Sequence, residues 1–204
     1  MRIWNYGLLL GCTLASALAT SSAAEQPVSG ALEFSRDAET VVIQFSERPH
    51  LLRDPDPGPS LRIYGDGRVE VHRPAYMQPA GDFTLTLSPE DLNALVESLV
   101  SRRLVDFDAD RVRGQTRAAE RTFRAAGRPL HAVFDDVVTT IEFRLEVYRP
   151  GSGPVQRDVH KKISWSTLRA DARRYPQLEE IQDLAFAQRE LMQLMQHPDL
   201  EPLR

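Results

Sequence analysis

The densest group of side chains with a defined chemistry is a run of arginines near the middle of the chain. Six arginines fall within 18 residues, opposed in that interval only by Glu120: Arg111, Arg113, Arg117, Arg121, Arg124 and Arg128. On a helix, the last five would share one broad face. Guanidinium groups gathered on one face bind lipid headgroups, polyanions or acidic protein surfaces.

The same arginines also fit a second interpretation, that of a solvated helix face. The chain uses arginine almost everywhere that it needs a cation, since its two lysines are Lys161 and Lys162. Both interpretations stay open on sequence alone. We take four of these residues as candidates for contact with an anionic surface or an acidic partner: Arg113, Arg117, Arg121 and Arg124.

Histidines and acids offer an alternative of another class, a hydrolase or metal-dependent enzyme with a site assembled from scattered residues. Its candidates are His72, His131 and Asp135. No two histidines stand at a spacing that places two metal ligands on one face of a helix or strand. The sequence also lacks the motifs of zinc peptidases, serine hydrolases, P-loop NTPases and dinucleotide-binding folds. It therefore favours a non-enzymatic protein, with no cofactor and no metal expected.

The first 24 residues have the order of segments that is typical of a secretory signal peptide. Met1-Arg2 is positively charged, residues 8–19 are uncharged and mostly apolar, and small residues follow up to Ala24. The apolar run is shorter than the ~20 residues that cross a bilayer. We predict cleavage after Ala24 and export to the periplasm or the medium. An alternative is a lipid anchor on Cys12, because Leu9-Leu10-Gly11-Cys12 is similar to a lipoprotein signal box.

Composition narrows the class of the exported chain. It has 204 residues, a net charge of -4, 42% hydrophobic residues and one cysteine, Cys12. These values exclude collagen-like, coiled-coil and wholly disordered chains, and the negative charge argues against nucleic-acid binding. After cleavage no cysteine would remain, so stability must come from a packed core rather than from disulfides. We expect a soluble mature protein without a transmembrane segment.

The pattern of apolar residues predicts strands and helices along most of the mature chain. Alternation predicts strands near 41–46, 61–64, 68–72, 83–87, 141–148 and 155–165. Gly65-Asp66-Gly67 favours a tight hairpin turn with positive φ at Asp66 and Gly67. Ser88-Pro89 is a strong helix start, an apolar stripe runs from Leu92 to Val100, and Arg102-Arg103 stand at the negative end of the helix. Helical patterns also cover 110–126, where glycines weaken the pattern, 166–174, and the stretch between Pro176 and His197.

These elements predict an α+β fold with a single antiparallel sheet, built from β-hairpins, and with helices packed on one face. The order of a hairpin followed by a helix occurs twice, at 61–102 and 138–197, which suggests two halves. Residues 25–31 are expected to be a short polar lead-in and residues 32–204 a single domain.

One stretch resembles a known group of proteins. Ile63-Tyr64-Gly65-Asp66-Gly67-Arg68-Val69, followed by Leu87-Ser88-Pro89-Glu90-Asp91-Leu92 and an apolar helix, is similar to small exported bacterial domains of unknown function. Those domains have an "IYGDGxV" hairpin, a capped helix, and then a second hairpin and helix. The resemblance covers most of residues 40–197. Many such domains carry cysteines near the first strand, and this chain has none there.

The resemblance implies fold and export, because the group has no activity to carry over. Together with the residue patterns, it predicts an interaction domain of the bacterial envelope. Its expected partners are another envelope protein or an anionic surface.

Overall fold

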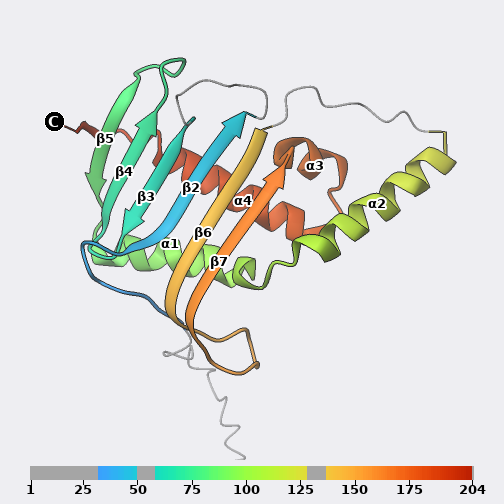
Figure 1. Cartoon of the computed structure of the whole chain (residues 1–204), viewed down its shortest axis with the longest axis horizontal. Helices are drawn as coiled ribbons and strands as arrows, with labels where there is room; N and C mark the ends of the chain where they lie inside the picture. The colour runs from blue at the N-terminus through green and yellow to red at the C-terminus, as the bar shows by residue number, and fades with distance from the viewer. Residues whose placement is uncertain (1–31, 50–57, 128–136, 204) are drawn as a thin grey trace, which may run out of the picture.

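The computed structural model describes residues 32–49, 58–127 and 137–203, and Figure 1 shows their arrangement. The predicted signal peptide and lead-in lie outside the described residues. So do Arg128, His131 and Asp135.

In the described residues, eight strands form one open antiparallel sheet. Its order is β1-β6-β2-β3-β4-β5-β8, and β7 pairs with β6. The strands are β1 (Leu32–Glu33), β2 (Val41–Pro49), β3 (Ser60–Tyr64), β4 (Arg68–Arg73), β5 (Gly81–Thr86), β6 (Val137–Tyr148), β7 (Gln156–Ser166) and β8 (Glu201–Pro202). Strand β2 pairs with β3 on one side and β6 on the other, so it joins the two hairpins β3–β4 and β6–β7.

Alternation along the strands separates a buried face of the sheet from a polar one. Apolar side chains from five strands lie at most a few per cent exposed on the inner face: Ile43, Phe45, Leu61, Ile63, Val69, Val71, Ile141, Phe143 and Ile163. Helices α1 (Pro89–Ser101) and α4 (Glu179–Leu194) lie behind the sheet on this side (Figure 1). Their apolar stripes complete the core, which supplies the stability of a fold without disulfides.

Helix α1 begins where the sequence predicted. Ser88 is its N-cap, and the Ser88 hydroxyl accepts a hydrogen bond from the Asp91 amide at 3.1 Å. Pro89 occupies the first turn, where its missing N–H costs nothing. The buried stripe is Leu92, Val96, Leu99 and Val100.

The described residues form three further helical segments. These are η1 (Leu104–Asp106), α2 (Ala109–Ala125) and α3 (Leu168–Arg174). Among the described residues, no helix is long and apolar enough to span a membrane.

The hairpin β3–β4 turns at Gly65-Asp66-Gly67, but its geometry differs from the predicted pair of positive φ angles. Gly67 has φ +93°, whereas Asp66 is not among the residues with positive φ. The Gly67 amide donates to the Tyr64 carbonyl at 3.1 Å, and the three residues 65–67 connect β3 to β4. One left-handed residue after a simple turn satisfies this loop length, so the second positive φ is not needed.

The α+β class with a single antiparallel sheet is confirmed, and each predicted hairpin–helix half is present. Strand β2 extends further than predicted, through Glu47 to Pro49. Pro49 is tolerated because it is the last residue of the strand, where it pairs with Val137.

Candidate functional site

Helix α2, which carries the candidate arginines, runs outward from the sheet (Figure 1). The Asp108 carboxylate caps it by accepting from the amides of Asp110 and Arg111, both at 3.0 Å. Val112 is fully buried, and the Phe123 ring stacks on Tyr175 with centroids 6.1 Å apart.

Two polar contacts reinforce this attachment. The Arg111 guanidinium donates to Glu180 of α4 at 2.5 Å, and the Tyr175 hydroxyl donates to Glu120 at 3.2 Å. Arg111 and Glu120 therefore both have hydrogen-bond partners outside α2.

The four candidate arginines follow one another along the exposed side of α2. At about 100° per residue, Arg113, Arg117, Arg121 and Arg124 fall within about 80° of the helix circumference. All four are exposed. We call these four residues the arginine strip. The helix predicted for 110–126 thus places them on one face, as the sequence pattern required.

Only one end of the arginine strip is neutralised by a carboxylate. Arg113 donates to Asp110 at 3.1 Å, and its guanidinium carbon lies 5.5 Å from the centroid of the Trp165 ring. Within the described part of the chain, Arg117, Arg121 and Arg124 form no ion pair with an acidic residue. The arrangement presents three unneutralised guanidinium groups to solvent.

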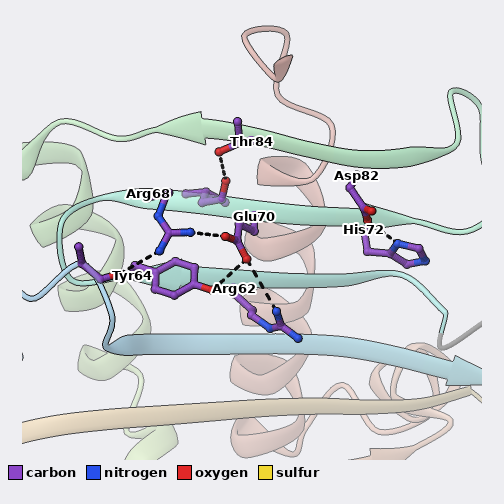
Figure 2. A network of polar contacts seen from close by, with 9 residues as sticks. Arg62, Tyr64, Arg68, Glu70, His72, Asp82 and Thr84 are labelled. Carbon is purple, nitrogen blue, oxygen red and sulfur yellow. Dashed lines mark hydrogen bonds and ion pairs between the residues drawn. The ribbon is translucent and has the colours of Figure 1, made fainter. Parts of the chain in front are cut away.

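The residues of the enzymatic alternative are not brought together by the described part of the chain. His72 lies on the polar face of the sheet, where its Nδ1 is 2.7 Å from Asp82 Oδ1 (Figure 2). His131 and Asp135 lie outside the described residues. Within the described ranges, no three His, Cys, Asp or Glu side chains form a group that could hold a metal ion.

The polar face of the sheet carries a network centred on Glu70 (Figure 2). The Glu70 carboxylate accepts from the Tyr64 hydroxyl at 2.9 Å and from Arg68, and Arg62 lies 3.7 Å away. The Arg68 guanidinium stacks over the Tyr64 ring at 3.7 Å and donates to the Ala38 carbonyl. Because these charges satisfy one another, the network holds the hairpin and leaves little free charge for a ligand.

Sequence reasoning missed a buried polar cluster between the sheet and α4. Glu47 is 6% exposed on the inner face of β2, although most of that face is apolar. Gln188 of α4 donates to Glu47 and to the Thr139 hydroxyl, the latter at 3.1 Å. Arg169 of α3 donates to both Glu47 oxygens at 3.0 and 2.9 Å. The available signal was the inward position of Glu47, two residues after Phe45 in an alternating strand.

Asp171 of α3 and Tyr175, the residue that follows this helix, are two further polar residues with partners in the structure. The Trp165 indole donates to Asp171 Oδ2 at 2.8 Å, and Thr167 donates to the same oxygen at 3.3 Å. Burial raises the pKa of Asp171, and these hydrogen bonds offset only part of that effect. Burial also raises the pKa of Tyr175 to about 12. Both groups support the packing of α2 and α3 rather than a reaction.

Asp171→Asn should remove a dependence of stability on pH. Because the folded-state pKa of Asp171 lies above its ordinary value of 3.8, the native state holds the proton more tightly than the unfolded state. Asp171 therefore adds to the free energy of unfolding fully below pH 3.8, and this contribution is lost as the pH rises through the folded-state pKa. Asn keeps an oxygen for the Trp165 indole and does not ionise.

Urea unfolding followed by tryptophan fluorescence at pH 3.5 and pH 7 checks this expectation. The difference in free energy of unfolding, variant minus wild type, should be larger at pH 7 than at pH 3.5. A constant difference would show that the Asp171 carboxyl ionises equally easily in both states.

Comparison with known proteins finds no relative of this chain. No protein-family model, no curated protein and no solved structure matches the chain. The resemblance to small exported bacterial domains thus stays a prediction.

Proposed function

We propose that this protein is a non-enzymatic binding domain of the bacterial cell envelope, and that the arginine strip of α2 binds an acidic protein partner. The observation that carries the proposal is the separation of the two sides of α2. One side is packed through Val112 and Phe123, and the other presents Arg117, Arg121 and Arg124 without carboxylate partners in the described residues. The location in the envelope rests on the sequence of residues 1–24.

The choice of an acidic protein over a lipid surface rests on where the apolar side chains of α2 lie. Helices that bind in the membrane interface insert apolar side chains beside their cations. Val112 and Phe123 of α2 instead pack against the body. The large hydrophobic side chains that are exposed in the described residues, Tyr76, Val155 and Leu203, lie outside the helices and strands.

Replacing all four arginines of the strip with glutamine should weaken binding of a fluorescent deca-glutamate peptide at least tenfold at low salt. Each exposed ion pair contributes about 0.5 kcal/mol, so the three arginines without a carboxylate partner contribute about 1.5 kcal/mol, or about tenfold in affinity. Binding by the wild type should also weaken as salt screens the charges. Fluorescence anisotropy measures both effects.

The matched control replaces four exposed arginines elsewhere: Arg144, Arg149, Arg157 and Arg173. It changes the net charge equally and should bind like the wild type. An equal loss of peptide binding in both variants would mean that net charge alone drives association. Binding to phosphatidylglycerol vesicles but not to the peptide would assign the strip to a membrane surface instead.

A further inference from the structure

A groove lies along the outer edge of the sheet, at strand β5. It has a volume of about 780 Å³, within the range of ligand pockets, and it is bounded by β5, α1, and the chain from the end of α4 to β8. Four consecutive residues, Thr84 to Leu87, line it. Since successive side chains of a strand point to opposite faces, a groove that touches all four runs along the backbone edge.

This edge is only partly covered by another strand. Among the described residues, β8 pairs with Phe83 and Thr84 and with no other residue of β5. Upstream of Glu201 the chain turns away towards α4, and the Leu200 amide donates to the His197 carbonyl at 3.3 Å. Leu85 and Thr86 are therefore left without a strand partner on the groove side.

The backbone of Thr86 faces the groove. The Leu203 amide donates to the Asp82 carbonyl, which points to the β8 side, whereas the Leu87 amide donates to Gly67 on the β4 side. Backbone groups alternate between the two neighbours along an antiparallel strand. Thr84 and Thr86 therefore share the orientation of Asp82, and the N–H and C=O of Thr86 are placed to pair with an added strand.

The groove is lined by acidic and apolar side chains. Among the described residues that line it there is no lysine or arginine, and there are four carboxylates: Asp91, Glu190, Asp199 and Glu201. His197 lies 3.9 Å from Asp199. The apolar side chains include Leu95 of α1 and Leu194 of α4. Charge complementarity selects a ligand with lysine or arginine side chains.

We infer that the groove binds an extended basic peptide segment of another protein, which adds to β5 as a strand in line with β8. Hydrogen bonds to Thr86 would hold its backbone. Alternate side chains would contact the leucines, and its cations would pair with the carboxylates. This surface is separate from the arginine strip, so the inference stands independently of the proposed function.

The test uses an acetylated, amidated eight-residue peptide of alternating valine and lysine, with the valine–glutamate peptide as its counterpart. The lysine peptide should bind saturably to the full mature chain, and the Thr86 amide should become protected from hydrogen exchange. Glu190→Lys with Asp199→Lys should weaken binding at least tenfold. The matched control, Glu97→Lys with Glu146→Lys, places the same charges on exposed sites outside the groove and should bind as the wild type does.

A second variant separates strand addition from attraction by charge alone. Thr86→Pro removes the groove-side N–H and no β4 hydrogen bond, which is the position where an edge strand tolerates proline. It should abolish binding. If this variant does not fold, a peptide N-methylated at alternate residues replaces it and should fail to bind.

Three results would overturn the inference: no saturable binding, equal binding of the N-methylated peptide, or equal weakening by the control pair. Concentration-dependent self-association of the wild type that Glu190→Lys with Asp199→Lys abolishes would also overturn it, because the occupant would then be a second copy of the chain. The four-arginine variant should bind the lysine peptide normally, which separates this test from that of the proposed function.

Discussion

Gly67→Val is expected to destabilise the protein by about 3 kcal/mol. Gly67 has φ +93°, and a β-branched residue in the left-handed region costs about 1–2 kcal/mol. A Cβ at this position would also lie 2.5 Å from the Leu87 carbonyl oxygen, so backbone at the start of α1 must shift. Overpacking of this kind adds about 1–3 kcal/mol.

Gly151→Val is the matched control. Gly151 has φ +51°, but a Cβ there would meet no atom within 4 Å. Gly151→Val should therefore destabilise the protein only through the strained backbone conformation, by about 1–2 kcal/mol. Urea unfolding of both variants measures the difference. Equal midpoints would show that the Leu87 carbonyl moves aside without cost.

Arg169→Met is expected to destabilise the protein by about 2–3 kcal/mol. The Glu47 side chain is 8% exposed, and Arg169 is the cation that the described residues place against it. Without Arg169 the carboxylate would keep Gln188 as a donor but would lack a compensating charge. Breaking a buried pair by removing one partner costs about 3–5 kcal/mol. We expect less here because the Arg169 side chain is 59% exposed and water would replace part of its contact.

Arg173→Met, on the same helix and exposed, serves as the control and should change stability by less than about 0.5 kcal/mol. Arg169→Lys should restore part of the loss, because it returns the charge without the planar donor group. Urea unfolding at pH 7 compares the three variants. If Arg169→Met unfolds at the same urea concentration as Arg173→Met, the buried Glu47 carboxylate does not need this partner.

Local signals in the sequence were sufficient for the elements that depend on neighbouring residues. The Ser88 cap, the Pro89 start and the stripe from Leu92 to Val100 act within one helix, so their pattern predicted α1 directly. The alternation of Ile141, Phe143 and Leu145 predicted β6 in the same way. The shared face of the arginine strip also followed from helix periodicity alone.

The tertiary structure decided the features that depend on residues distant in sequence. A Cβ on Gly65 would clash with the Ser35 carbonyl oxygen, so this glycine is required by the approach of another segment and not by its own φ. The Glu47 cluster joins residues separated by up to 141 positions, and an acidic residue in an alternating strand does not reveal its partner.

The same limit applies to the two candidate surfaces. Periodicity grouped the arginines, but the packing of Val112 and Phe123 decided that their face points to solvent. The groove at β5 exists because β8 covers only Phe83 and Thr84 before the chain departs towards α4. Sequence by itself determined the elements and the composition of their faces, because those follow from the local periodicity of the chain. Which faces remain uncovered depends on how distant elements meet, and that is set by packing in three dimensions.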